Sequence, residues 1–326
     1  MDITELASAV ARGERRALAR AITLAESARE DHRSQALALL QALPKDRQAL
    51  RIGLSGTPGV GKSTFIESFG MMLVGMGKRV AVLAVDPSSA RSGGSILGDK
   101  TRMDRLARAP QAFIRPSPSQ THLGGVARRS REAVSLCEAA GFDVVLIETV
   151  GVGQSETVVA EMSDLFLLLL APAGGDELQG VKRGIMEIAD MILVNKADGD
   201  LKPAAMRTCA DYAGALRLLR KRPQDPEGYP KAMMVSALQE NGLTDVWADI
   251  EALIEWRRAQ GFWDKNRADQ ARYWFGQEVR QALLSQLETP QARSLIETFS
   301  AQVIEGETSP SAAAKAFLAE LSAKAP

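Results

Sequence analysis

A glycine-rich stretch carries the clearest chemical signal in the sequence. The letters GTPGVGKST, residues 56–64, fit the pattern G-x-x-x-x-G-K-[ST] and stand between a short apolar run and a helix-like stretch. In such a loop, glycines let backbone N–H groups point at phosphate oxygens, the lysine neutralises the β and γ phosphates, and the serine hydroxyl can ligate Mg²⁺. The residues expected to form this phosphate loop are Gly56, Thr57, Pro58, Gly59, Val60, Gly61, Lys62, Ser63 and Thr64.

Three acidic residues are candidates for holding the metal ion and the reacting water. Asp86 ends the run VAVLAVD, Glu148 ends the run VVLIE, and Asp99 follows a glycine-containing loop. Because open α/β sheets bind ligands at the carboxyl ends of their strands, these carboxylates can converge with Ser63 on Mg²⁺ or on its waters. For Asp86 and Asp99, a role in a turn or as a helix N-cap is the alternative.

The stretch ETVGVGQSE, residues 148–156, has the acid and the glycine of a nucleotide switch, with one irregularity. Gly151 follows the acid, but Gln154 lies two places beyond the usual position of a water-orienting glutamine. No arginine evidently stands where it could reach a γ-phosphate, and a site without an arginine finger can lose about 10³–10⁵ in rate. We therefore expect slow hydrolysis by the chain alone, with these catalytic residues: Lys62, Asp86, Asp99, Glu148 and Gln154.

The stretch NKAD, residues 195–198, predicts which base is bound. The Asp198 carboxylate can accept hydrogen bonds from guanine N1–H and the exocyclic amine, a donor pair that adenine lacks on that edge. Asn195 can bond the ring or brace the phosphate loop, the stem of Lys196 can lie over the purine, and the Ala237 N–H can face guanine O6. The residues expected around the base are Asn195, Lys196, Asp198, Ser236, Ala237 and Leu238. The sequence therefore favours GTP and GDP over adenine nucleotides.

Seven short apolar runs must position these residues. They are Ile52–Leu54, Val80–Val85, Ala112–Ile114, Val144–Ile147, Leu165–Leu170, Met191–Val194 and Ala232–Val235. Helix-like stretches separate most of them, and this alternation predicts a doubly wound, mostly parallel α/β sheet that is buried on both faces.

The two ends of the chain have a different, helical character. Residues 1–48 read as a helical segment whose second helix runs from Asp31 to Leu43, residues 49–260 as the nucleotide-binding domain, and residues 261–326 as a helical arm. All four tryptophans lie within residues 247–274. This density of large apolar side chains predicts that the tail packs on the core or on a second copy of the chain.

The composition excludes several classes of protein. The 326 residues have a formal net charge of +0, so nothing suggests a nucleic-acid or membrane partner. Two cysteines, Cys137 and Cys209, are expected to be reduced thiols in a cytoplasmic protein, and two histidines are too few for a zinc or nickel store. The longest apolar run, Leu165 to Pro172, is too short to span a bilayer, and the first residues do not resemble a signal peptide.

Several longer strings resemble one family of GTPases. The stretches GTPGVGKST, VDPSS, GGSILGDKTRM, IRPSPS, ETVGVGQSE, GDELQGVKRG and NKAD are similar to those of the MeaB/ArgK-type GTPase chaperones of adenosylcobalamin-dependent acyl-CoA mutases. The best-known client of that family is methylmalonyl-CoA mutase. The strings GGSILGDKTRM and GDELQG are the most specific, because generic GTPases lack them.

The resemblance implies a fold, a mechanism and partners. It implies a P-loop GTPase domain with an N-terminal helical part and a C-terminal arm that forms a homodimer. The acids Asp86, Asp99 and Glu148 then lie near the metal and the hydrolytic water. The partners implied are the mutase and a cobalamin adenosyltransferase of the same pathway. The nucleotide state would gate the loading of adenosylcobalamin, and the mutase would accelerate hydrolysis.

Two further features follow from the resemblance. The stretch 174–182 matches a loop that relays the nucleotide state to the mutase, and an ordinary exposed helix start is the alternative. Its candidate signalling residues are Gly174, Asp176, Glu177, Gln179 and Lys182. The chain also has Thr121-His122 where the family usually has Gly-Thr, and His122 is either a surface substitution or a sign of a related client.

Two other functions remain open from the sequence. One is a small-molecule kinase or a transport-associated ATPase, against which the guanine-reading Asp198 argues. The other is a nickel metallochaperone of related fold, which would normally carry a His- or Cys-rich metal site.

Overall fold

The computed structural model describes residues 2–27, 29–85, 103–116, 123–149, 155–172 and 183–323. The chain divides into two compact units, Met1–Ala268 and Asp269–Pro326. No helix among the described residues has both the length and the apolar character needed to cross a bilayer.

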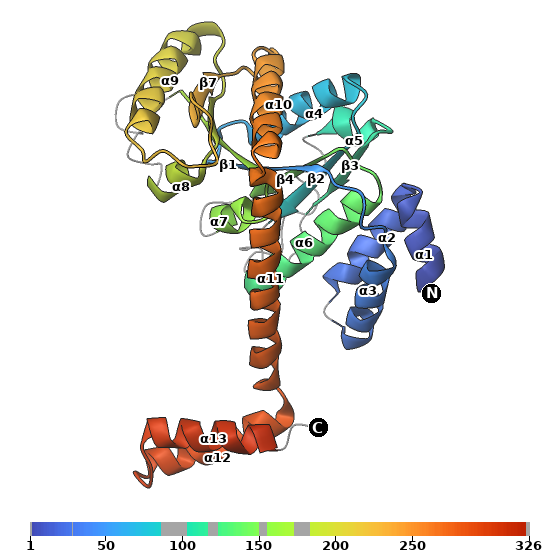
Figure 1. Cartoon of the computed structure of the whole chain (residues 1–326), viewed down its shortest axis with the longest axis vertical. Helices are drawn as coiled ribbons and strands as arrows, with labels where there is room; N and C mark the ends of the chain where they lie inside the picture. The colour runs from blue at the N-terminus through green and yellow to red at the C-terminus, as the bar shows by residue number, and fades with distance from the viewer. Residues whose placement is uncertain are drawn as a thin grey trace. The chain divides into compact units, whose positions relative to one another are not determined.

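The first unit is built on one sheet of seven strands (Figure 1). They are β1 (Leu50–Gly56), β2 (Val80–Val85), β3 (Ala112–Arg115), β4 (Val144–Thr149), β5 (Leu165–Leu170), β6 (Met191–Val194) and β7 (Lys231–Met234). Their order across the sheet is β3-β2-β4-β1-β5-β6-β7, and every pairing is parallel. Each of the seven apolar runs therefore forms a strand, and the predicted doubly wound α/β fold is confirmed.

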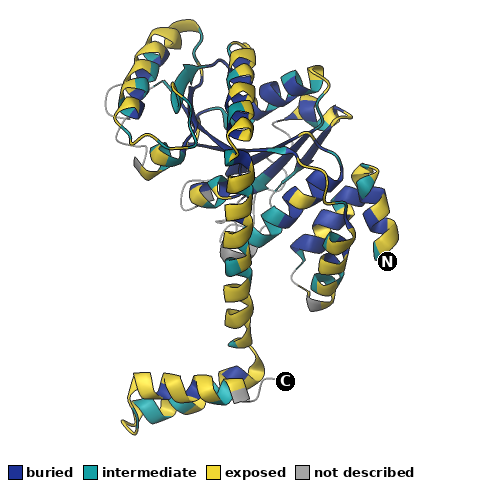
Figure 2. Ribbon diagram, in the orientation of Figure 1, coloured by how far each residue is buried: buried dark blue, intermediate teal, exposed yellow. Residues whose placement is uncertain are grey.

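Helices cover both faces of this sheet (Figure 1). One face carries α4 (Lys62–Gly75), α5 (Asp104–Arg108) and α10 (Leu243–Ala259). The other carries α6 (Leu123–Ala139), α7 (Ser155–Ala160) and α8 (Arg183–Ile188), while α9 (Lys202–Arg217) packs on β6 and β7. Strands β4, β5 and β6 are buried at every residue (Figure 2), which explains why their sequences are continuous apolar runs.

One hydrophobic core lies between the sheet and the helices α4 and α10. The rings of Phe65 and Phe69 stack with centroids 5.2 Å apart, and Trp247 of α10 meets Phe69 edge-on at 6.1 Å. All three side chains are buried. These aromatic contacts fix α4, the helix that follows the glycine-rich loop, against the rest of the unit.

The N-terminal segment forms three helices, α1 (Ile3–Ala11), α2 (Arg15–Glu26) and α3 (Glu30–Ala42), and the predicted second helix at Asp31–Leu43 corresponds to α3. They pack together and against α6. Two ion pairs join them to the sheet layer, Arg115 with Glu26 and Arg33 with Glu132. This segment therefore belongs to the first unit.

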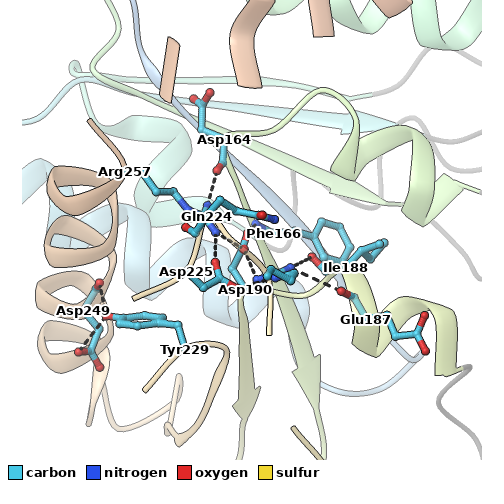
Figure 3. A network of polar contacts seen from close by, with 11 residues as sticks. Asp164, Phe166, Glu187, Ile188, Asp190, Gln224, Asp225, Tyr229, Asp249 and Arg257 are labelled. Carbon is cyan, nitrogen blue, oxygen red and sulfur yellow. Dashed lines mark hydrogen bonds and ion pairs between the residues drawn. The ribbon is translucent and has the colours of Figure 1, made fainter. Parts of the chain in front are cut away.

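Buried arginines close the sheet at the amino ends of its strands. Arg257 of α10 donates to the Asp190 carboxylate at 2.6 Å, to Asp225 at 2.8 Å and to the Asp164 carbonyl at 2.9 Å (Figure 3). Asp164 and Asp190 stand directly before β5 and β6. The arginine therefore ties the starts of two neighbouring strands to the end of α10.

A second arginine, Arg267, ties the start of β1 to the start of β5. Arg267 donates to the two carboxylate oxygens of Asp164 at 2.7 and 2.6 Å, to Glu138 at 3.0 Å and to the Ala49 carbonyl at 2.7 Å. Arg51 completes this cluster with two bonds to Glu138, at 3.0 and 2.7 Å. The amino edge of the sheet is therefore held by connected, buried charges.

The tail contains α11 (Phe262–Gln286), α12 (Pro290–Ile304) and α13 (Pro310–Ala323). Trp263 is buried, and the guanidinium groups of Arg258 and Arg267 lie over its ring, at 4.3 and 4.6 Å from the ring centroid. Both Trp263 and Arg267 belong to the first unit. The start of α11 thus packs within the first unit, while α12 and α13 pack on each other in the second unit.

Candidate nucleotide-binding site

The glycine-rich loop links the end of β1 to the start of α4. Gly59 and Gly61 have φ values of +80° and +88°, in the left-handed region that favours glycine. A Cβ atom at Gly61 would lie 2.8 Å from Asn195 Nδ2, whereas one at Gly59 would meet nothing within 4 Å. Thr57, Pro58 and Gly59 are exposed, whereas Val60 is buried. This arrangement suits a phosphate cradle.

Helix α4 begins at Lys62, so Ser63 and Thr64 lie in its first turn. The N–H groups at the start of a helix favour an anion. Lys62 Nζ donates to the carbonyl of Thr149, the last residue of β4. The lysine therefore already reaches from the phosphate loop to the strand that carries Glu148.

Glu148 lies where the sequence predicted, at the carboxyl end of β4. It is in register with Leu54 of β1 on one side and with Ala84 of β2 on the other, and it is 3% exposed. The next residue, Thr149, donates its hydroxyl to Ser55 Oγ at 3.1 Å. The strand that carries the acid is therefore fixed to the strand that leads into the phosphate loop.

The residues Asn195 and Lys196 brace the phosphate loop from the side of β6. Asn195 Nδ2 donates to the Val60 carbonyl at 2.9 Å, and Lys196 Nζ donates to the Gly59 carbonyl at 2.7 Å. Lys196 has a φ of +57°, which is uncommon for a residue with a side chain. Backbone strain of this kind persists where several contacts fix the residue, as the bond to Gly59 helps to do here.

The Asp198 carboxylate is oriented by the loop that follows β7. Ser236 Oγ donates to Asp198 Oδ2 and accepts from the Gln239 N–H at 3.1 Å. Asp198 is half-buried, whereas Ser236 is buried and Leu238 is 78% exposed. The structure thus brings the two predicted base-contacting stretches together at the carboxyl ends of β6 and β7.

One expected contact differs in the structure. The Ala237 N–H, expected to face guanine O6, donates to Asn195 Oδ1 at 3.0 Å. The physical reason is that the Asn195 side chain lies between two loops and uses both ends of its amide, one for Val60 and one for Ala237. The sequence could not show this, because it gives no distance between β6 and β7.

Some predicted site residues lie outside the part of the chain that the structure describes. They are Asp86, Asp99, His122, Gln154, Gly174, Asp176, Glu177, Gln179 and Lys182. Within the described residues, no group of three or more His, Cys, Asp or Glu side chains could hold a metal ion. The candidate metal ligands that the structure places are therefore Ser63, in the first turn of α4, and Glu148, at the carboxyl end of β4, which neighbours β1.

Three polar residues of the site were not predicted. Ser55 and Thr149 stand at the ends of buried strands, and a hydroxyl residue that closes an apolar run could have drawn attention to both. Ser68 donates to the Ala237 carbonyl at 2.7 Å across 169 residues of sequence. No sequence signal marks such a contact, because it depends on how α4 and the loop after β7 meet in space.

The chain matches the family model described as Methylmalonyl Co-A mutase-associated GTPase MeaB over residues 18–292. It is 53% identical over 322 residues to a protein of Caulobacter vibrioides named as a GTPase, covering 98% of both chains. It is 48% identical to GTPase ArgK of Escherichia coli, covering 84% of this chain and 83% of ArgK. It is 46% identical to the mouse protein named Methylmalonic aciduria type A homolog, mitochondrial, covering 97% of this chain and 79% of the mouse protein.

A solved structure shares both the fold and the sequence. The crystal structure titled LAO/AO transport system kinase is 36% identical to this chain and superimposes with a TM-score of 0.75, covering 98% of this chain and 97% of that one. The matched residues include the glycine-rich loop, the NKAD stretch and the loop after β7. The chain is therefore a GTPase with a P-loop fold, and it belongs to the family of methylmalonyl-CoA mutase-associated GTPases, MeaB.

Proposed function

We propose that this GTPase is a chaperone of an adenosylcobalamin-dependent acyl-CoA mutase. It gates the loading of adenosylcobalamin and protects or reactivates the mutase, according to the nucleotide it holds. The observation that carries the proposal is the family match over residues 18–292, whose description names a mutase-associated GTPase. The name of the mouse relative, which refers to methylmalonic aciduria, supports a role in the same chemistry.

In this proposal the guanine base lies against Asp198 and Lys196, and the phosphates lie in the loop 56–64. The geometry supports this placement, because Lys196 and Asn195 already connect the base side to the carbonyls of Gly59 and Val60. A direct test uses Asp198→Asn with GTP and xanthosine triphosphate. An asparagine offers a donor where guanine also has donors, so the variant is expected to prefer the xanthine nucleotide. An unchanged preference for GTP would refute the placement.

The residues at the phosphate end fit a Mg²⁺ ion. Ser63 supplies a hydroxyl in the first turn of α4, and Glu148 supplies a carboxylate at the end of the neighbouring β4. Both are oxygen ligands of the kind that Mg²⁺ prefers, and Asp86 and Asp99 are proposed to complete the set. When bound, Mg²⁺ neutralises charge on the phosphates, and Lys62 contributes the protein's own positive charge at the same place.

We propose that hydrolysis is slow in the chain alone and is accelerated by the mutase. The proposed catalytic group is Lys62, Asp86, Asp99, Glu148 and Gln154, and the partner would act through residues 174–182. The test measures GTP turnover under single-turnover conditions with and without purified mutase. We expect acceleration by the mutase, and a fast enzyme that the mutase leaves unchanged would refute the proposal.

The client is one of several related mutases. Methylmalonyl-, isobutyryl-, ethylmalonyl- and 2-hydroxyisobutyryl-CoA mutases share the cofactor, and a cobalamin adenosyltransferase is the proposed source of that cofactor. Affinity purification of the chain from cells that contain these mutases identifies the partner. Retention of one mutase in a nucleotide-dependent manner is the expected result, and equal retention with GDP and GTP contradicts the gating role.

We propose that the protein is a cytoplasmic homodimer joined through its C-terminal helices. A groove of about 510 Å³ between α12 and α13 is lined by apolar residues such as Phe299, Val303 and Phe317. On α11, Phe275, Val279 and Leu283 recur every four residues and are 71%, 42% and 58% exposed. A stripe and a groove of this kind are typical of a helix-mediated interface with a second copy.

A truncation that removes the C-terminal helices tests this interface, and the bonds of Arg267 decide where it should end. A chain that ends at residue 261 would lose Arg267, whose bonds hold Asp164 and Glu138. A chain that ends at Ala268 keeps them. We expect the chain that ends at Ala268 to be monomeric by analytical ultracentrifugation and to bind GDP like the full chain. A truncated protein that remains dimeric rules out this interface.

The solved relative titled as a transport system kinase supports one alternative. In that case the γ-phosphate would pass to an acceptor other than water. Following ³²P from labelled GTP distinguishes the two, because a hydrolase releases only inorganic phosphate.

A further inference from the structure

Helix α4 is bonded directly to the loop that orients the base-reading residues. Ser68, in the second turn of this helix, is 6% exposed, and its hydroxyl donates to the Ala237 carbonyl at 2.7 Å. The same helix begins with Lys62 and Ser63, which are part of the phosphate loop 56–64. One helix therefore contacts both the phosphate side and the base side of the site.

The Ser68 bond closes a ring of contacts around the site. The Ala237 N–H donates to Asn195 Oδ1 at 3.0 Å, and Asn195 Nδ2 donates to the Val60 carbonyl at 2.9 Å. Val60 leads through Gly61 into α4, which returns to Ala237 through Ser68. Both polar groups of Ala237 are thus engaged, one by the β6 loop and one by α4, and Ala237 is 1% exposed.

A second, outer connection joins α4 to the same loop. Glu67 Oε1 accepts from the Arg105 N–H at 2.7 Å, and Arg105 Nη1 donates to Glu240 Oε1 at 2.7 Å. Glu240 has a φ of +56°, so its backbone is held in the left-handed region. The side chains of Arg105 and Glu240 are 59% and 49% exposed, and an exposed ion pair contributes less than a buried hydrogen bond.

We propose that Ser68 is a positioning residue for guanine recognition. It holds the loop 236–241 at a fixed distance from the phosphate-binding end of α4. Ser236 of that loop donates to the Asp198 carboxylate. Without the Ser68 bond, the loop and the carboxylate shift together, and the contacts of Asp198 with guanine N1–H and the exocyclic amine weaken. The inference rests on the proposed placement of the base at Asp198.

Calorimetric titration with three ligands tests this role. GDP binding depends on both the phosphate loop and the base contacts. IDP lacks the exocyclic amine of guanine, so comparing it with GDP measures recognition of that amine. Pyrophosphate binding depends on the phosphate loop alone. For Ser68→Ala we expect GDP to bind about tenfold more weakly, as the loss of one buried hydrogen bond implies. We expect the preference for GDP over IDP to fall and the affinity for pyrophosphate to stay within about twofold, because the phosphate loop keeps its own contacts.

Three matched variants sharpen the result. Ser68→Thr keeps the donor, and it should recover most of the GDP affinity. Ser163→Ala removes another buried hydroxyl that donates to a backbone carbonyl, that of Val159 at 2.6 Å, on the amino side of β5. It should leave all three affinities unchanged. Glu240→Gln should weaken GDP by about twofold, as expected for an exposed pair.

The outcomes distinguish a failure of the positioning role of Ser68 from a failure of the proposed base placement at Asp198. If Asp198→Asn switches the protein to xanthine nucleotides while Ser68→Ala binds GDP like the native chain, the role of Ser68 is refuted and the base site stands. If Asp198→Asn does not switch the preference, the placement of the base is refuted. If Ser68→Ala loses pyrophosphate and GDP equally, Ser68 supports α4 as a whole, and its positioning role is overturned.

Discussion

At the amino ends of the strands, charged side chains are buried with one another, whereas at the carboxyl ends polar side chains mostly bond to backbone carbonyls. Arg257, Arg267 and Arg51 meet Asp164, Asp190 and Glu138 at the amino edge, and all six are buried or nearly so. At the carboxyl edge, Lys62, Asn195 and Lys196 donate to carbonyls of Thr149, Val60 and Gly59.

The difference follows from what each edge must do. Buried opposite charges satisfy one another, and removing one partner leaves an uncompensated charge away from water. Such an edge stabilises the fold and has no need of a ligand. A cradle of glycines and carbonyls, with half-buried Lys62 and Asp198, keeps polar groups that a nucleotide can reach. The amino edge of the sheet therefore stabilises the fold, and the carboxyl edge carries the proposed nucleotide site.

The largest effect should come from breaking the amino edge. Arg257→Met removes bonds to Asp190, Asp225 and the Asp164 carbonyl. We expect the free energy of unfolding to fall by about 3–5 kcal/mol, because buried carboxylates lose a partner. Denaturant unfolding of the nucleotide-free protein measures this, and the GDP affinity of the folded protein should not change.

The matched control is an arginine in an exposed pair. Arg272 lies 3.1 Å from Asp269, with side chains 80% and 53% exposed. Arg272→Met should cost less than about 0.5 kcal/mol. Equal losses for the two variants would mean that the amino-edge network does not hold the fold, and the comparison between the edges would fail.

The second variant should lose activity and keep its stability, whereas Arg257→Met should lose stability and keep its GDP affinity. Lys62→Ala removes a positive charge at the carboxyl edge, where the side chain is half-buried and bonded to a carbonyl. We expect the rate of GTP hydrolysis to fall by at least about 10²-fold, as for other groups that stabilise transition-state charge. The free energy of unfolding should change little. A stability loss as large as that of Arg257→Met would show that both edges have the same role.

A third prediction compares two glycines of the phosphate loop. Alanine at either position occupies the left-handed region, which costs about 1–2 kcal/mol for an L-residue. At Gly61 the added Cβ would also lie 2.8 Å from Asn195 Nδ2, whereas at Gly59 it has open space. Gly61→Ala should therefore weaken GDP binding more than Gly59→Ala, by about a further tenfold for the displaced Asn195 bonds. Equal affinities in calorimetric titration would mean that Asn195 does not brace the loop.

The carboxyl edge was largely predictable from the sequence, and the amino edge was not. Local patterns identify the phosphate loop, Glu148 and Asp198, because each stands at the end of an apolar run that becomes a strand. Arg267 and Asp164 are 103 residues apart in the sequence. Charged residues of this kind look like surface residues until the fold brings them together. Long-range pairing, which a single sequence does not record, decides that they are buried.

The same limit applies inside the site. The sequence predicts that Asn195 bonds the ring or braces the phosphate loop and that Ala237 faces the base, but the bond between Asn195 and Ala237 depends on how β6 and β7 are spaced. The predicted arm began at residue 261, yet Trp263 packs beside Gln48, which accepts from its Nε1 at 3.3 Å. An aromatic cluster in the tail indicates packing, but it does not identify the surface that receives each ring.

The smallest expected effect concerns a neutral buried pair at the carboxyl edge. Thr149→Val removes the hydroxyl that donates to Ser55 Oγ, and both residues are buried. We expect a loss of about 1 kcal/mol in unfolding free energy, because one hydroxyl is left without its partner.

The double variant Ser55→Ala with Thr149→Val removes both partners and should be no less stable than the single one. The same cycle with Arg51→Met and Glu138→Gln at the amino edge should give a larger coupling energy, because those partners are charged. If the coupling energy of Ser55 with Thr149 equals that of Arg51 with Glu138, charge does not distinguish the two edges.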